Sequence, residues 1–120
     1  MAPQDTCCSI APYFIVHDGQ LDAFKALGEQ CMAKAQTEAK CLYYGLSFDG
    51  NVAYVREGYE DGDGVLAHLD NVGDLLGELL KIADLTRLEI HGPEAELAKL
   101  RGPLADMKAQ FFTLEYGIRR

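Results

Sequence analysis

The chain has 120 residues, of which 48% are hydrophobic and 25% are charged, and its formal net charge is −8. This length suits a single domain with a modest core, and the composition is typical of a globular protein. The acidic balance argues against nucleic-acid binding, because no basic stripe is present to neutralise phosphates. No apolar run approaches the length of a membrane span, so we expect neither a nucleic-acid nor a membrane partner.

The N-terminal residues and the cysteines indicate a reducing compartment. The first six residues contain neither a basic start nor an apolar stretch, so no signal peptide is predicted and we expect a cytoplasmic protein. Cys7, Cys8, Cys31 and Cys41 lack the spacing of metal ligands, and free thiols are the simplest interpretation. A redox role for the adjacent pair stays open. The sequence also lacks nucleotide, phosphate and metalloprotease motifs, so we expect no cofactor and no metal.

Hydrophobic periodicity and turn residues divide the chain into strands and helices. Asp49-Gly50 is the strongest hairpin signal, because both central residues of a tight two-residue turn need positive φ. Asp61 and Asp63 offer N-cap chemistry for the helix that follows the hairpin. In chain order, the predicted elements are a strand over 12–18, a helix over about 21–38, strands over 41–48 and 51–59, a helix over about 63–83, a strand over 85–91, a helix from 93 that Gly102-Pro103 interrupts before 104–107, and a strand over 111–116.

This order of elements predicts an α+β protein. A β-α-β-β-α-β order is that of the ferredoxin-like arrangement, in which helices pack on one face of an antiparallel sheet. The last helix and strand look like an extension of that sheet. We interpret residues 1–120 as one domain, with a core over about 9–92 and a C-terminal extension over about 93–120.

His68 is the first candidate functional residue. It lies one helical turn after Val65 and one turn before Val72, at the margin of the apolar stripe of the 63–83 helix. A histidine at this position can face a cavity under the helix while remaining half desolvated. The alternative is a packed core histidine whose nitrogens are satisfied by hydrogen bonds.

Alternation along the strands predicts two different faces of the sheet. If Asp49-Gly50 is the turn, Phe48 faces Asn51, and the pairs count backwards from there. The helix-covered face is then predicted to carry Leu42, Tyr44, Leu46, Phe48, Ala53, Val55, Leu88 and Ile90. The helix-free face is predicted to carry Tyr43, Tyr54, Arg56, Arg87 and Glu89, with His17 and His91 as candidate further members. Which face Tyr13, Ile15 and His17 share is not decided by alternation.

The helix-free face mixes aromatic rings with a few charges. Such a mixture suits a partly enclosed site for a small molecule. The alternative is a ladder of arginine and glutamate with tyrosines packed at a dimer seam. Both interpretations require a second subunit over this face, so we expect a homodimer.

Two segments of the sequence carry a family resemblance. They are 56–61 (Arg-Glu-Gly-Tyr-Glu-Asp) and 65–72 (Val-Leu-Ala-His-Leu-Asp-Asn-Val). They resemble the strand-end aromatic, acidic turn and Ala-His helix of the antibiotic biosynthesis monooxygenase family, within the dimeric α/β-barrel superfamily. The resemblance covers about residues 14–91. It implies a homodimer whose two sheets face each other to form a barrel.

Members of this family commonly oxidise quinol-like or polyketide aromatics with molecular oxygen and without flavin or metal. This chain has no Trp, which the haem-degrading branch uses, so haem degradation is not expected. It also has Gly73-Asp74 where many relatives place His-Phe. From the usual activity of the family, the resemblance implies a cofactor-independent monooxygenase that acts on a small aromatic, quinol-like or polyketide substrate.

Cofactor-free oxygenation needs a base, a cation that holds the substrate anion, and a dry site. His68 is the candidate base or proton shuttle, because the ordinary pKa of histidine is near neutrality. Arg56 is the second candidate catalytic residue. The candidate substrate-binding residues are Tyr43, Tyr54, Arg87, Glu89, His17 and His91. Two alternatives remain, a binding barrel without catalysis and a proton-transfer isomerase that uses the same base without oxygen.

Overall fold

The computed structural model of the protein describes residues 5–120. The first four residues, which contributed to the signal-peptide prediction, lie outside the described part. The elements are β1 (Cys8–Val16), α1 (Leu21–Ala35), β2 (Cys41–Asp49), β3 (Val52–Tyr59), α2 (Gly62–Ile82), β4 (Ala83–Gly92), α3 (Glu94–Arg101), the 3₁₀ helix η1 (Ala105–Met107) and β5 (Gln110–Thr113).

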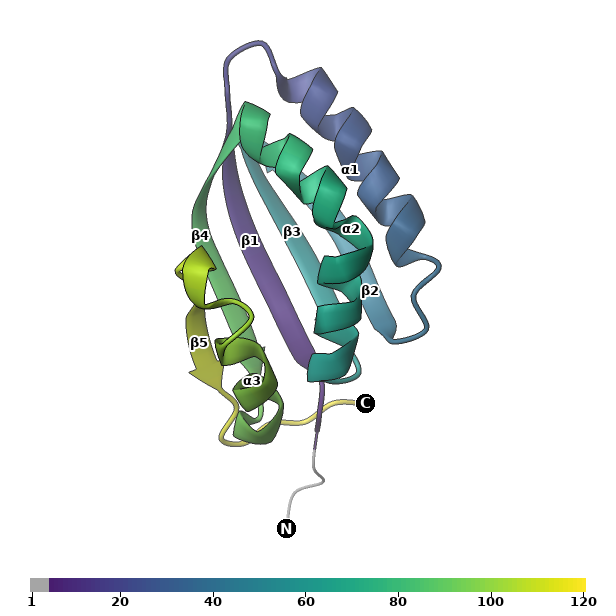
Figure 1. Cartoon of the computed structure of the whole chain (residues 1–120), viewed down its shortest axis with the longest axis vertical. Coiled ribbons are helices and arrows are strands. Elements are labelled where there is room, and N and C mark those ends of the chain that lie inside the picture. Colours follow the sequence, from purple (N-terminus) through teal and green to yellow (C-terminus); the bar gives the residue numbers. More distant parts are fainter. Residues whose placement is uncertain (1–4) are drawn as a thin grey trace.

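The strands form one sheet with the order β2-β3-β1-β4-β5 (Figure 1). Strands β1 to β4 pair antiparallel, and β5 pairs parallel to β4 at its outer edge. Helices α1 and α2 cover one face of the sheet, and α3 with η1 lies beside α2 on the same face. The predicted α+β, ferredoxin-like fold with a C-terminal helix and strand is confirmed, although the added strand makes the sheet mixed.

The hairpin turn lies one residue later than predicted. Asp49 pairs with Val52 and Phe48 with Ala53, so Gly50 and Asn51 are the turn residues. Gly50 has a φ of 57°, which suits a turn with glycine as its first central residue. The pairing register therefore differs by two residues from the predicted one. Because side chains alternate with a period of two, this difference by itself does not exchange the two predicted faces.

One residue of β2 departs from the predicted alternation. The pairing of β2 with β3 shifts between Cys41 and Tyr43, which leaves Leu42 in a bulge. Leu42 is 41% exposed and does not join Tyr44 in the core. Its predicted place under the helices is therefore wrong.

The core lies between the sheet and the helices. Phe24 of α1 is fully buried, and its ring meets Phe14 and Phe48 edge-on at centroid distances of 5.4 and 6.0 Å. The predicted helix-side residues Tyr44, Leu46, Phe48, Val55, Leu88 and Ile90 all pack in or against the core clusters, which confirms their face.

The central strand β1 begins at Cys8, four residues before its predicted start. Its pairing with β3 is interrupted at Ala11 and Pro12, because proline has no N–H to donate. Phe14 and Val16 enter the core. The Tyr13 ring instead lies 4.9 Å from that of Tyr54, tilted by 34°, on the helix-free face. This contact assigns Tyr13 to the helix-free face, which alternation alone did not decide.

The helix-free face of the isolated chain is open. Ile15 and Val52 are 47% and 45% exposed, and Tyr43 is also exposed. In the described part of the chain, no helix is both long and apolar enough to cross a membrane.

Truncation of Phe24 should cost far more stability than truncation of Met32 on the same helix. Phe24→Ala leaves a cavity among buried rings and should lower the free energy of unfolding by about 3–5 kcal/mol. Met32 lies on the exposed side of α1, so Met32→Ala should cost less than about 1 kcal/mol. Urea denaturation of the two variants measures the difference. Equal losses would contradict the place of Phe24 at the centre of the core.

Candidate functional site

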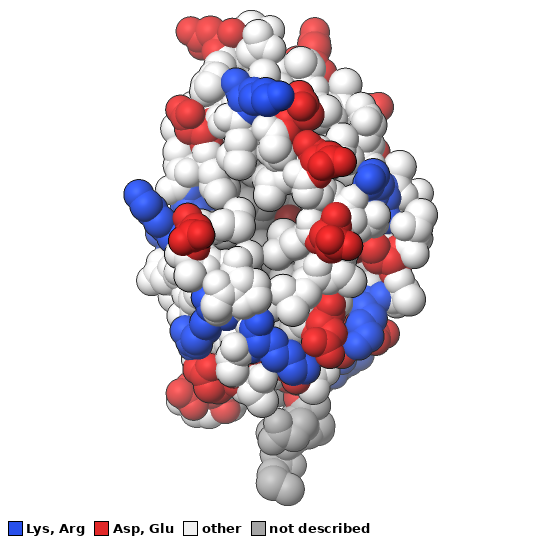
Figure 2. Space-filling view, viewed as in Figure 1, with Lys and Arg blue, Asp and Glu red and all other residues white. Residues whose placement is uncertain are grey.

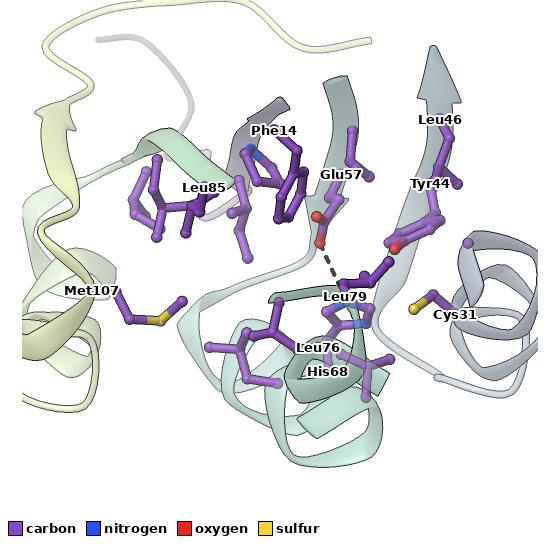
Figure 3. Close-up of a pocket in the computed structure, with 18 of the residues that line it drawn as sticks. Phe14, Cys31, Tyr44, Leu46, Glu57, His68, Leu76, Leu79, Leu85 and Met107 are labelled. Atoms are coloured by element: carbon purple, nitrogen blue, oxygen red, sulfur yellow. Dashed lines mark ion pairs between the residues drawn. The ribbon is translucent and has the colours of Figure 1, made fainter. Parts of the chain in front are cut away.

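A cavity opens between the sheet and the helices. Figure 2, viewed from the helix side, shows a hollow near the middle of this face, rimmed by uncharged atoms. The interior space that water can occupy is about 60 Å³, and about 670 Å³ is empty when the gaps between lining side chains and the mouth are included. The lining is mainly apolar and comes from the sheet, α1, α2 and the segment around η1. Its polar side chains, Tyr44, Glu57 and His68, lie close together (Figure 3).

The start of α2 positions His68. The Asp61 side chain caps the helix by accepting a hydrogen bond of 2.9 Å from the Gly64 N–H, as predicted. Lys40 Nζ lies 2.7 Å from the other Asp61 oxygen and fastens the helix to the loop before β2. Val65 and Val72, one turn on either side of His68, are buried. The imidazole therefore points under the helix, into the cavity, and His68 is only 2% exposed.

His68 lies between two carboxyl groups from different parts of the chain. Its Nδ1 is 2.9 Å from both oxygens of Glu38, and its Nε2 is 3.3 Å from Glu57 Oε1. Asn71 Nδ2 donates to Glu38 Oε2 at 2.8 Å, and the Tyr59 hydroxyl donates to Glu57 Oε1 at 2.8 Å. Each carboxyl group is thus held by a second side chain while it faces the histidine.

Burial sets the protonation states of this cluster. It raises the pKa of Glu57 to about 8, against the opposing effect of the Tyr59 hydrogen bond, and the charge of Glu38 adds to the rise. Burial lowers the pKa of His68, although its hydrogen bond to Glu38 favours the charged form. At neutral pH, Glu57 is therefore protonated and His68 is neutral.

These states assign the hydrogens of the cluster. The Nδ1–H of His68 donates to Glu38, which leaves the lone pair of Nε2 on the side of Glu57. A proton donor and a proton acceptor therefore stand 3.3 Å apart at one end of the cavity. This arrangement can take a proton from a bound molecule at one atom and deliver a proton at another.

Two tyrosines hold the imidazole ring in place. The rings of Tyr44 and Tyr59 lie 5.4 and 5.1 Å from that of His68, centroid to centroid. Burial raises the pKa of both phenols, so both keep their protons. The orientation of His68 is thus fixed by packing as well as by Glu38.

The site contains residues that the sequence predictions did not include. Glu57 belongs to the helix-covered face, because it alternates with Val55 and Tyr59 along β3, and this register could have identified it as a buried carboxyl group. Glu38 has no comparable signal. The predicted helix 21–38 would have carried it, but α1 ends at Ala35, and the loop that follows turns Glu38 towards α2.

The other predicted site residues, except His17, lie on the opposite face of the sheet. Tyr43, Tyr54, Arg56, Glu89 and His91 line a hollow there, with about 400 Å³ of space that water can occupy. The Arg56 guanidinium lies over the Tyr43 ring at 5.4 Å, and Glu89 accepts from Arg87 and from His91 Nε2. The sheet separates all of them from the imidazole of His68, so the structure does not bring His68 and Arg56 into one cavity.

His17 is remote from both hollows. It follows β1, and its Nε2 contacts Asp84 Oδ1 at 3.0 Å at the exposed start of β4. His91 lies at the opposite end of β4, so His17 does not join it.

Residues 5–120 contain no group of three or more His, Cys, Asp or Glu side chains placed to hold a metal ion. The four cysteines are free thiols. Cys8 is fully buried, and burial raises its thiol pKa to about 12, which makes it a poor nucleophile. Cys31 lines the cavity, and burial raises its pKa as well.

The fold is shared with ferredoxin-like proteins of the antibiotic biosynthesis monooxygenase type. Proteins from Chloroflexus aurantiacus and Nitrosomonas europaea, each proposed to be an antibiotic biosynthesis monooxygenase, match with TM-scores of 0.61 and 0.68. They are 18% and 13% identical to this chain, cover 72% and 77% of it, and match over 92% and 94% of their own length. Identity this low establishes the fold alone.

MupZ from Pseudomonas fluorescens is similar to almost the whole chain. It is 46% identical, the match covers 95% of this chain and 94% of MupZ, and the TM-score is 0.90. The chain therefore belongs to the same family as MupZ. No protein-family model and no curated protein matches the chain.

Glu57 should make the protein less stable as the pH rises from about 4.5 to about 8. Over this range the unfolded chain has lost the Glu57 proton, whereas the folded protein keeps it. Rising pH therefore favours unfolding, by on the order of 1 kcal/mol per pH unit. Glu57→Gln has no such proton to lose, and its stability relative to that of the unmodified protein should rise across this range.

Urea denaturation of both proteins at a series of pH values measures this difference. His68 acts in the opposite direction, because stability due to its neutral form is lost as the pH falls through its lowered pKa. It is present in both proteins, so the comparison isolates Glu57. Parallel stability curves would show that Glu57 is ionised in the folded state.

Proposed function

We propose that this protein is a cofactor-independent acid–base catalyst that isomerises a small, mainly apolar molecule in the cavity under α2. The observation that carries the proposal is the protonated Glu57 beside the neutral Nε2 of His68, at one end of an apolar cavity. A pair of titratable groups whose surroundings push their pKa values apart is typical of acid–base sites.

The pair can complete a catalytic cycle without a cofactor. His68 Nε2 removes a proton from a carbon next to a carbonyl group, while Glu57 gives its proton to the carbonyl oxygen, and an enol forms. The imidazolium of His68 then returns its proton to a different carbon, and Glu57 recovers its own from the enol hydroxyl. The molecule is isomerised, and both side chains regain their starting states. Glu38 stabilises the imidazolium between the two steps.

The apolar lining supports this chemistry. Hydrogen bonds and charges act more strongly where water is excluded, and an enol is protected from competing reactions with solvent. Asn71 and Tyr59, which hold the two carboxyl groups, keep the donor and the acceptor in a fixed arrangement before a ligand arrives.

A cofactor-free monooxygenase is the second candidate. The shared fold with proteins proposed to be antibiotic biosynthesis monooxygenases favours it. His68 would then deprotonate a phenol, and the anion would reduce oxygen. A cation to hold that anion is needed, and Arg56, the predicted one, faces the other side of the sheet. None of the described side chains that line the cavity is a lysine or an arginine. A binding protein without catalysis is the third candidate.

Loss of His68 or Glu57 should greatly slow the isomerisation of a minimal probe. We expect the protein to convert 3-cyclohexen-1-one to its conjugated isomer, which is followed by ultraviolet absorbance. His68→Ala and Glu57→Gln should each lower the rate by about 10²- to 10⁴-fold. Glu78→Gln, on the exposed side of α2, should leave it unchanged.

The same assay separates the three candidates. The rate should survive treatment with a chelator, and it should fall above about pH 8, where Glu57 loses its proton. Oxygen uptake with a reduced quinone, together with no isomerisation, would favour the monooxygenase. No turnover of either probe by the folded protein would favour a binding role.

We also propose that the protein works in the cytoplasm as a homodimer joined through the helix-free sheet face. Four free thiols suit a reducing compartment. Exposed Ile15, Val52 and Tyr43 give the open face an apolar surface that a second copy would cover. A stable interface of this kind should bury on the order of 2,000 Å² in total.

A charge on the helix-free face should separate the two subunits. Light scattering should give the mass of a dimer for the unmodified protein at micromolar concentration and that of a monomer for Ile15→Asp. Leu80→Asp is the matched control, because Leu80 is similarly exposed but belongs to α2, on the other side of the sheet. A monomeric unmodified protein, or dissociation by Leu80→Asp instead, would contradict this interface.

A further inference from the structure

The polar groups of the cavity are confined to one end. Figure 3 shows Glu57, His68 and Tyr44 together, whereas Met107 lies on the far side of the cavity, beyond Leu85. The side chains between these ends are apolar. A molecule that fills the cavity therefore meets hydrogen-bonding groups at one end and only hydrocarbon and thioether surface along the rest.

The polar end favours an uncharged head group. The described lining has no lysine or arginine, and burial keeps His68 neutral near pH 7. The Glu38 carboxyl group stands directly behind the imidazole, 2.9 Å from Nδ1. A carboxylate or phosphate placed here would lose its water and gain no cation. The oxygen of a hydroxyl or carbonyl group, in contrast, can accept the proton of Glu57.

The C-terminal extension builds the far wall of the cavity. Leu104 and Met107, just before and at the end of η1, both line it. Lys108, with a φ of 54°, then ends η1 in the left-handed conformation, and β5 begins two residues later. The wall therefore comes from a segment outside the βαββαβ core.

This wall is anchored to the core. Leu97, Leu100 and Leu104 are almost fully buried in one hydrophobic cluster. Strand β5 pairs with β4, and the Leu114 N–H extends the pairing with a bond of 2.7 Å to the Gly92 carbonyl oxygen. Packing of the segment before η1 and strand pairing of the segment after it thus fix the position of Met107.

The extension also distinguishes this chain from its shorter fold relatives. The fold relatives that cover 72% of this chain match over nine-tenths or more of their own length, so their chains are shorter. The βαββαβ core, residues 8–92, makes up a similar share of this chain. MupZ, which is similar over 95% of the chain, shares nearly all of it. A wall made by the extension suits a ligand particular to this family.

We propose that the C-terminal extension sets the length of the ligand, and that the ligand class is an uncharged molecule with one polar oxygen function at one end of an apolar body. The oxygen lies at Glu57 and His68, and the apolar body extends to Met107. The proposal rests on the proposed function for the identity of the polar end. Met107 is a specificity-determining residue that takes no part in the chemistry.

Binding of primary alcohols from 1-butanol to 1-decanol tests the length limit by isothermal titration calorimetry. Affinity should rise about fourfold for each added methylene until the chain reaches Met107, and then stop rising. Met107→Ala should move this limit to longer alcohols, and Met107→Trp should move it to shorter ones. Met32→Ala and Met32→Trp, on the exposed side of α1, are the matched controls and should leave it in place.

Head-group selectivity is tested with octanoate at pH 7. It should bind at least tenfold more weakly than 1-octanol, because its charge finds no cation. A length limit that Met107 does not move, no binding of any alcohol, or equal binding of octanoate would overturn the proposal. His68→Ala should slow the isomerisation of 3-cyclohexen-1-one by about 10²- to 10⁴-fold and leave the length limit where it is. The length limit and the acid–base function can therefore fail separately.

Discussion

The contact of His68 with Glu38 and Glu57 is the constraint on which the rest of the site depends. A histidine that only packs in a core needs one hydrogen-bond partner for each ring nitrogen. Here both partners are carboxyl groups, and both are nearly buried. Two ionised carboxylates with one neutral imidazole would be costly in such surroundings, so one carboxyl group keeps its proton. Burial selects Glu57 for this state, and the site thereby holds an acid and a base together at neutral pH.

Two of the three residues in this cluster could be read from local patterns. Helical periodicity placed His68 at the margin of the buried stripe, and alternation along 51–59 puts Glu57 on the same face as Val55. The turn lies one residue later than predicted, but a register difference of two residues preserves both faces. Glu38 could not be found in this way. It contacts a side chain thirty residues away, and it does so because α1 ends early, at Ala35.

The size and the lining of the cavity were the other features beyond reach of the sequence. Alternation correctly divided residues between the faces, and Tyr43, Tyr54 and Arg56 do share the helix-free one. It could not show that a single chain already encloses space under its helices. That space depends on contacts distant in sequence, between α2, the sheet and η1. The extension, which looked like an addition to the edge of the sheet, supplies one wall through Leu104 and Met107.

The position of positive charge, more than that of the base, separates the candidate reactions. A base such as His68 serves isomerisation and oxygenation equally well. Oxygenation of a phenol leaves an anion that must persist until oxygen arrives, and Arg56 is on the wrong side of the sheet to hold it. Isomerisation needs no lasting anion, because Glu57 protonates the oxygen as His68 removes the carbon-bound proton. The protonated carboxyl group therefore does the work that a cation would otherwise do, and it keeps that proton at neutral pH because its burial between the sheet and the helices removes it from water.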